Sequence, residues 1–443
     1  MFILRDILIP LQAQFEHSRK GAERGTWFVY TLLAVITHFT SSRTPNLLRC
    51  LQTLFELPVC QRRFYTFMAS SKLPWQRLWA TLWALIPNPR VDGRLLLVLD
   101  DFINPKTGKN IFGCASFFDH AAKVNQSKYV WSQNVVSIGL LKVVKGRWAC
   151  LPLVFRFYHM KKEIDAGNVK MDRKTLPFQT KFEQAVEMLS KVSASFPGSP
   201  VLVVTDSWFG NDGLFKPMRN IVGQQCHILS RLRVNASLFD SPPERCSQQR
   251  GRTKKYGDKL GNATTLAQRF LQCATTYSIN LYGKQRDVLA YDRIVMLRTL
   301  KCAVRVVWVY RRSQWVALFT TDLDLSVEQV IEYYGARWKI ESGFKEIKQD
   351  IGSTKSQTWN PHAVTNHLNF CMMASTVTWI YADRLDRTPT RCYAVNNRKH
   401  FAFSDVRKLI TQAALDKDFV SVCPKPGKPT QNSFIAALLR MVA

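Results

Sequence analysis

The sequence has little acidic charge, no closely spaced cysteine pairs and no long hydrophobic run. Its 443 residues include 32 Asp and Glu against 62 Lys and Arg, which gives a formal net charge of +30. No polylysine tail accounts for this excess, so the cations are spread along the chain. Such a chain is expected to carry an extended surface for a polyanion, and nucleic acid is the leading partner.

The eleven cysteines are scattered singly and form no Cys-x-x-Cys pair. This pattern argues against a zinc ribbon and a disulfide framework, and it fits a reducing compartment. Arg5 and Asp6 interrupt the apolar N-terminal run, which is not typical of a secretory signal. The apolar stretch Trp27–Phe39 is too short to span a bilayer. We therefore expect a cytoplasmic protein, in a bacterial cytoplasm or nucleoid, with no membrane partner.

The length predicts several domains, and the pattern of the sequence changes at four places. Apolar residues first repeat at helical spacing, then alternate as strands, and basic residues punctuate the turns. The predicted segments are an N-terminal helical bundle (1–90), the first part of an α/β core (91–235), a β-rich insertion (236–318), the second part of the core (319–385) and a basic C-terminal region for dimerisation or DNA contact (386–443). The bundle suits DNA contact, and packing or dimerisation is the alternative.

Two short, unbroken apolar runs each end in an acid. The run RLLLVLDD ends in Asp100 and Asp101, and PVLVVTD ends in Asp206. Runs of this kind indicate buried central strands. Alternation along a strand puts Asp100 and Asp101 on opposite faces, and we prefer Asp100 as the functional acid because it directly ends the apolar run. Asp101 then faces the following loop. Taken alone, each acid is best explained as the cap of a turn.

Two further patterns are local. The runs Tyr129–Leu141 and Trp148–Tyr158, joined by a Lys-Gly pair, predict a hairpin. Thr180 followed by Glu183 predicts the start of a helix. The core therefore alternates strands and helices, with the acids at strand ends.

A helix is predicted from Ser326 to Gly352, where Ser326 and Gln329 form a capping box and Gly352 supplies a stop. Four polar residues of this helix fall in one stripe roughly 60° wide, flanked by apolar residues that should pack inward. The four are Tyr334, Arg337, Glu341 and Lys348, and their apolar neighbours are Val330, Ile331, Trp338 and Phe344. An i, i+4 ion pair on a solvated face explains Arg337 and Glu341 simply. A metal or a phosphate would explain the same charges on an inward face.

Asp100 or Asp101, Asp206 and Glu341 can meet at one end of a sheet. Hard oxygen donors next to a phosphate substrate are the environment that Mg²⁺ favours. Two such ions about 3.5–4 Å apart would activate a water or a 3′-hydroxyl and stabilise the leaving oxygen. The three acids together, in a strongly basic chain, favour this interpretation over three separate turn caps.

The spacing Y-x2-R-x3-E-x6-K resembles the signature of insertion-sequence DDE transposases of the family called insertion sequence four. The flanking segments TTDLDLS, YGARWKIE and FKEIKQDIG resemble it as well. The resemblance covers roughly residues 91–385. It implies an α/β fold with an RNase H-like core, a mixed sheet with flanking helices, interrupted by the β-rich insertion.

The same resemblance implies residue roles. Asp100, Asp206 and Glu341 would be the catalytic residues and hold two Mg²⁺ ions, with Mn²⁺ able to substitute, while Asp101 is the alternative first ligand. Tyr334, Arg337 and Lys348 would grip the DNA. Members of the family cut both strands of double-stranded DNA at terminal inverted repeats, usually through a hairpin, and join the ends to target DNA. A homodimer that synapses two ends is the expected assembly.

Further DNA contacts are predicted in the β-rich segment. A basic loop near residue 250 would lie against a DNA backbone, with a solvated loop as the alternative; its cations are Arg250, Arg252, Lys254 and Lys255. Trp315 or Trp308 could stack on a flipped base, although core packing is the simpler role for either ring. Two rival functions remain at this point: an RNase H-like nuclease adopted by its host, and a DNA-binding regulator that no longer binds metal.

Overall fold

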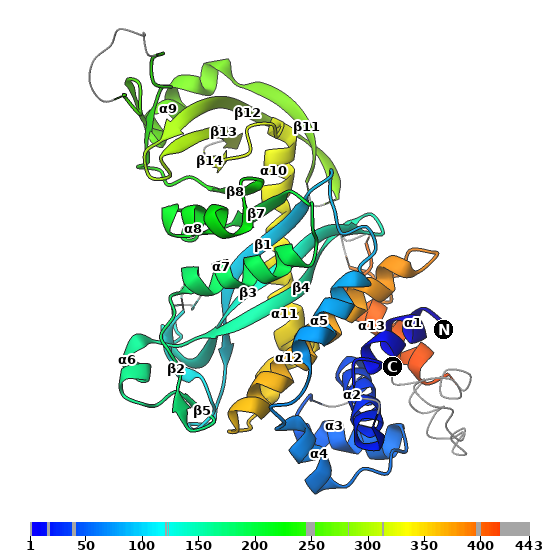
Figure 1. Ribbon diagram of the computed structural model, residues 1–443. Coiled ribbons are helices and arrows are strands. Elements are labelled where there is room, and N and C mark those ends of the chain that lie inside the picture. Colours follow the sequence, from blue (N-terminus) through cyan, green and yellow to red (C-terminus); the bar gives the residue numbers. More distant parts are fainter. Residues whose placement is uncertain are drawn as a thin grey trace.

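Twelve strands form one mixed sheet within the described chain, and helices pack on both of its faces (Figure 1). The computed structural model describes residues 2–15, 18–37, 41–119, 122, 124–244, 253–281, 283–311, 314–395 and 400–416. The strands of the sheet are β1 (Leu95–Pro105), β2 (Cys114–Phe118), β3 (Tyr129–Val144), β4 (Arg147–Tyr158), β7 (Val201–Thr205), β8 (Cys226–Arg231), β9 (Ser237–Phe239), β10 (Lys259–Asn262), β11 (Thr275–Leu281), β12 (Lys284–Leu297), β13 (Cys302–Arg311) and β14 (Gln314–Thr320).

The strand order is β10-β9-β12-β13-β14-β8-β7-β1-β3-β2, with β11 beside β12 and β4 beside β3. The pairs β1–β7 and β7–β8 are parallel, whereas β14 pairs antiparallel with β8. The strands of residues 236–318 therefore continue the same sheet through the β14–β8 pair. The division of the chain into five segments stays a prediction.

The central strands are buried as their apolar runs predict. Residues Leu95–Leu99 of β1 and Val201–Thr205 of β7 are all buried. One local prediction is wrong: no loop follows Asp101, because β1 continues through both aspartates to Pro105. Both side chains find partners on neighbouring elements, so the strand can continue.

The hairpin β3–β4 lies on the other side of β1 from β7. Its two-residue turn consists of Lys145 and Gly146, with φ values of 47° and 79°. Positive φ at both central residues is typical of the turn that matches the twist of two antiparallel strands. The predicted hairpin is confirmed, with longer strands.

Helices α7 (Lys181–Ala194) and α8 (Asp212–Val222) pack together on one face of the sheet (Figure 1). The start of α7 is the predicted capping box, in which the Thr180 side chain accepts from the backbone N–H of Glu183. Helix α8 begins at the Asn211 cap and contains Pro217. The N-terminus of α7 is thus held at a defined place beside β1.

The opposite face is covered by the segment that follows β14. The single helix predicted from Ser326 to Gly352 is wrong in detail, because the segment consists of α10 (Val327–Ala336), α11 (Trp338–Lys345) and a π-helical turn η3 (Glu346–Asp350). At Arg337 the backbone N–H is shared between the carbonyls of Tyr333 and Tyr334, both at 3.2 Å. The turn tightens there and widens after Lys345. The predicted capping box of Ser326 and Gln329 is present.

The elements described between residues 2 and 84 are all helices: α1 (Phe2–Gln12), α2 (Arg19–Thr37), α3 (Thr44–Arg49), η1 (Cys50–Leu54), α4 (Gln61–Met68) and α5 (Trp75–Ala84). They pack beside the long buried helix α12 (Pro361–Arg384) (Figure 1). The indole nitrogens of Trp75 and Trp79 donate to the side-chain oxygens of Asn366 and Asn369 of α12, at 2.7 and 2.8 Å. These polar bonds fix α5 against α12 within an otherwise apolar contact.

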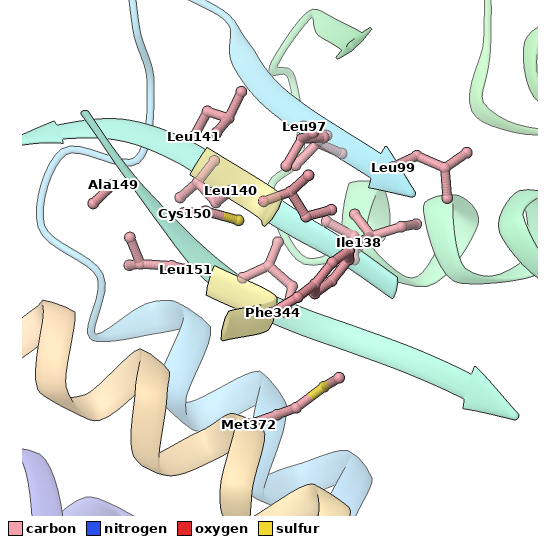
Figure 2. Packing of buried hydrophobic residues seen from close by; sticks show 14 of the residues in the cluster. Leu97, Leu99, Ile138, Leu140, Leu141, Ala149, Cys150, Leu151, Phe344 and Met372 are labelled. Carbon is pink, nitrogen blue, oxygen red and sulfur yellow. The ribbon is translucent and has the colours of Figure 1, made fainter. Parts of the chain in front are cut away.

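The hydrophobic core joins the sheet to the helices on the α12 side. Figure 2 shows buried side chains of β1, β3 and β4 clustered with Phe344 of α11 and Met372 of α12. The ring of Phe344 also lies 4.3 Å from that of Phe102 of β1, centroid to centroid. This packing sets the position of α11 against β1.

The remaining elements are short or peripheral. They are α6 (Lys161–Asp165), β5 (Lys170–Met171), β6 (Lys174–Thr175), α9 (Ala263–Phe270), η2 (Leu271–Cys273), η4 (Ser353–Lys355) and α13 (Phe403–Ala414). Within the predicted basic C-terminal region, residues 396–399 and 417–443 lie outside the described residues. Across the described ranges, no helix has the length and apolarity needed to cross a membrane.

Candidate active site

Asp100 and Asp206 directly follow the last paired residues of two parallel strands. The parallel register of β1 and β7 ends with Leu99 opposite Thr205; Asp100 is the next residue of β1, and Asp206 is the first residue after β7. The carboxyl ends of parallel strands are where ligands bind in open α/β sheets. Two buried apolar strands therefore place two carboxylates side by side at one edge of the protein interior.

Asp100 faces the helix segment that follows β14. Its Oδ2 lies 3.2 Å from Nη1 of Arg337, and its Oδ1 accepts the backbone N–H of Asp101 at 2.9 Å. Asp101 faces the opposite side of the sheet, where its Oδ2 accepts from Lys181 and Asn134, both at 2.9 Å. Alternation along β1 separates the two acids in this way.

Arg337 stands at the junction of α10 and α11 and joins two acids. Its Nη2 donates to Oε1 of Glu341 at 3.0 Å, while Nη1 binds Asp100. The residue is only 8% exposed, and its Nε is buried without a hydrogen-bond partner among the described residues. The predicted i, i+4 pair is thus present, but it is inward and shared with a strand. An unpaired buried donor is costly and suits an acceptor brought by a ligand.

The carboxylates of Asp100 and Asp206 interact electrostatically. Burial raises the pKa of Asp100 to about 7, and repulsion from Asp206 adds to the rise, while Arg337 opposes it. The pKa of Arg337 is itself raised by Tyr334 and the two acids although burial lowers it, so the guanidinium stays charged. A like charge beside a desolvated carboxyl makes added positive charge favourable there.

Tyr334 belongs to the same cluster. Its ring centroid lies 5.7 Å from the Arg337 guanidinium carbon. Burial raises the pKa of the Tyr334 phenol, and the charge of Asp206 adds to that rise while Arg337 opposes it. The charge of Asp206 thus acts on both Asp100 and Tyr334, as expected from the adjacent backbone positions of the two aspartates.

Lys348 of η3 lies beside β1, further along this strand than Asp100. Its Nζ is 5.9 Å from the ring centroid of Phe102, two residues beyond Asp100. The single stripe predicted for an unbroken helix therefore gathers Tyr334, Arg337 and Glu341, while Lys348 lies within the π-helical turn η3. Burial lowers the pKa of the Lys348 ammonium.

Asp206 also caps a turn, which is the structural role that the sequence analysis gave as the simple explanation of each acid. Its Oδ1 accepts the backbone N–H groups of Trp208 and Phe209, both at 3.0 Å. One oxygen therefore caps the turn after β7. Capping leaves a second carboxylate oxygen on the residue, so the two roles are compatible.

The other residues predicted to contact DNA differ in their exposure. Trp308 is fully buried, and its indole nitrogen donates to the carbonyl of Ala263 at 3.1 Å. Trp315 is partly buried on β14, opposite Tyr310. Lys254 and Lys255 are exposed, whereas Arg250 and Arg252 lie outside the described residues. Core packing is thus the observed role of Trp308.

Sequence reasoning missed several residues next to the acids. Lys181 and Asn134 bind Asp101, and no local pattern pairs residues so far apart in the chain. Trp208 and Trp338 are 45% and 51% exposed, the latter against the expectation that it packs inward. The only sequence feature that could have indicated the two tryptophans is their position: Trp208 lies two residues after Asp206, and Trp338 directly follows Arg337.

The cluster suits a divalent cation by its chemistry. Its acids supply the hard oxygen donors that Mg²⁺ prefers, and the raised pKa of Asp100 shows the need for positive charge. As they stand, no three His, Cys, Asp or Glu side chains of the described residues form a group that could hold a metal ion. The guanidinium of Arg337 lies between Asp100 and Glu341.

Comparison with known proteins identifies a family for the chain. A search of curated proteins finds no significant match. The family model described as DDE superfamily endonuclease matches residues 21–310, which include Asp100 and Asp206 and end before Glu341. This match spans more than half of the chain. The protein therefore belongs to the DDE superfamily endonucleases.

Proposed function

We propose that the protein is a cut-and-paste transposase of the insertion sequence four type, with Asp100, Asp206 and Glu341 as its metal ligands. One observation carries the proposal: Arg337 connects Asp100 of β1 with Glu341 of α11, and Asp206 repels the same carboxyl. Acids brought together from distant segments at a cost in free energy are typical of a site built for cations.

Arg337 supplies the positive charge in the ligand-free arrangement. Asp100, Asp206 and Glu341 would hold divalent ions, and the Arg337 guanidinium would then be available to a DNA phosphate, where its unpaired Nε would gain a partner. When bound, two Mg²⁺ ions would activate a water or a 3′-hydroxyl and stabilise the leaving oxygen. Mn²⁺, which accepts similar oxygen donors, would substitute.

The other residues of the cluster would position DNA. Tyr334 packs on Arg337 and would offer its hydroxyl to a phosphate oxygen, while Lys348 would add a point charge further along β1. Lys254 and Lys255 are exposed and would hold the backbone at a distance from the acids. Trp315, partly buried, is proposed to stack on a flipped base.

The wider assembly follows from the proposed reaction. The core strands and α11 would form an RNase H-like unit, with residues 236–318 as its insertion and the helices of residues 1–90 as a DNA-binding unit. Two ends joined in concert require two active sites, so a homodimer on two terminal inverted repeats is proposed. Cleavage of both strands would pass through a hairpin.

An end-cleavage and joining assay tests the proposal. The full chain is mixed with Mg²⁺, a supercoiled target plasmid and a labelled duplex that carries one inverted repeat from the ends of its own element. A transposase yields a hairpin-sized product and end-to-plasmid joints. Cleavage without joints would make the protein an endonuclease only, and no Mg²⁺-dependent cleavage would contradict the metal site.

A further inference from the structure

The first turn of α7 is bonded to β1 and also contacts the segment that follows β7. Lys181 is the first residue of α7, and its Nζ lies 2.9 Å from Oδ2 of Asp101. Asn134 of β3 donates to the same oxygen at 2.9 Å. The capping box of Thr180 and Glu183 fixes where the helix begins, so Lys181 reaches β1 from a rigid base.

The same ammonium group also contacts the segment after β7. It lies 5.1 Å from the ring centroid of Tyr158 and 5.5 Å from that of Trp208. Trp208 stacks on Phe182, the neighbour of Lys181, with ring centroids 4.8 Å apart and planes inclined by 4°. A cation near two aromatic rings in a partly buried position is attracted to both of them.

Each end of this set of contacts is one hydrogen bond from a candidate ligand. The backbone N–H of Asp101 donates to Oδ1 of Asp100 at 2.9 Å. The backbone N–H of Trp208 donates to Oδ1 of Asp206 at 3.0 Å. A continuous path therefore runs from Asp100 through Asp101, Lys181 and Trp208 to Asp206.

We infer that Lys181 is a positioning residue that sets the distance between the carboxylates of Asp100 and Asp206. It acts from the face of the sheet opposite to that of Arg337. This inference rests on the proposed function, because it assumes that the two aspartates hold metal together. Two carboxylates at adjacent positions repel each other, so their arrangement needs support from other residues. Removing a residue that orients a metal ligand typically lowers metal affinity or activity by about ten- to hundred-fold.

The test compares Lys181→Met, which keeps the length but loses the charge, with Lys181→Arg, which keeps a donor for Asp101. Lys191→Met is the matched control, because Lys191 lies on the same helix, is 53% exposed and pairs only with Glu187, at 2.7 Å, among the described salt bridges. Mn²⁺ binding to the full chain is titrated by electron paramagnetic resonance without DNA. End-duplex binding is measured separately over a range of salt concentrations.

We expect Lys181→Met to weaken Mn²⁺ binding by about ten-fold or more, with DNA affinity and its salt slope unchanged. Lys181→Arg should recover most of the affinity, and Lys191→Met should bind as the wild type does. A weaker DNA affinity and shallower salt slope, with Mn²⁺ binding intact, would make Lys181 a phosphate contact and overturn the inference.

Trp208→Ala tests the same path from the β7 side. It should also weaken Mn²⁺ binding, whereas Trp208→Phe, which keeps an aromatic ring on Phe182, should weaken Mn²⁺ binding less. If Lys181→Met does not fold, these two Trp208 variants test the positioning role. Wild-type protein that binds no Mn²⁺ would contradict the proposed function itself. Wild-type binding with unaffected Lys181 and Trp208 variants would contradict only the positioning role.

Discussion

Asp100 and Asp101 are neighbours in the sequence but belong to different networks. Oδ2 of Asp100 lies 3.2 Å from Arg337 on one face of the sheet, and Oδ2 of Asp101 lies 2.9 Å from Lys181 on the other. The alternation of β1 makes this separation inevitable once the strand continues through both residues. The doubled acid is therefore two residues with two different environments.

The first prediction separates these two roles. Asp100→Asn should abolish Mg²⁺-dependent cleavage of an end duplex, because a proposed metal ligand is lost. Asp101→Asn should leave cleavage measurable but shift its Mg²⁺ dependence to higher concentration, because the bond to Lys181 is weakened. Initial cleavage rates over a Mg²⁺ titration provide the measurement. Equal abolition by both variants, with both proteins folded, would contradict the assignment.

The second prediction concerns the fork of Arg337. The guanidinium binds Asp100 and Glu341 in the ligand-free arrangement and is proposed to bind a DNA phosphate during cleavage. Lysine keeps the charge, but its single nitrogen cannot bind the phosphate through two donors. Losing one charged hydrogen bond of about 1.5–3 kcal/mol predicts a ten- to hundred-fold slower cleavage by Arg337→Lys. Lys345→Met, an exposed change on α11, is the control. A variant as fast as wild type would show that the fork is dispensable.

The third prediction is a pH dependence of stability that is set by His367. Burial lowers the pKa of this histidine to about 4, and its Nε2 lies 2.7 Å from the carbonyl of Ser42, so the ring is neutral and Nε2 carries the proton. The unfolded chain binds the proton more readily, with a pKa near its usual 6.5. The contribution of His367 to stability should therefore be complete above about pH 6.5 and be lost as the pH falls towards 4.

Urea unfolding at several pH values measures this contribution. The difference of about 2.5 in pKa corresponds to roughly 3 kcal/mol at neutral pH as an upper figure. His367→Gln should flatten the pH dependence between 4 and 6.5 relative to wild type. His362→Gln is the control, because His362 lies at the start of α12 and binds Asp172 on a partly exposed surface. An unchanged slope in His367→Gln would contradict the buried neutral ring.

Local patterns in the sequence predict the elements that carry the acids. The unbroken apolar runs locate β1 and β7, and the capping boxes at Thr180 and Ser326 locate the starts of α7 and α10. These features depend on neighbouring residues only. They are sufficient to place Asp206 at the end of its strand and Glu341 on a helix.

The rest depends on partners that are distant in the chain. Strand β1 continues past Asp100 because its backbone pairs with β3 as far as Pro105, and Arg337 and Lys181 pair with the two acids. The predicted helix is divided at Arg337, whose side chain reaches across to β1 while its backbone N–H is shared between two carbonyls. Periodicity within one segment contains no information about such contacts.

The central claim is that Glu341 completes a metal site for DNA cleavage. The most direct measurement is Mg²⁺-dependent cleavage of an end-containing duplex by Glu341→Gln, beside its binding to the same duplex. Glu328→Gln, in the first turn of α10, is the matched control. The account predicts that Glu341→Gln binds the duplex but does not cleave it, while Glu328→Gln does both. Undiminished cleavage by folded Glu341→Gln would contradict the account.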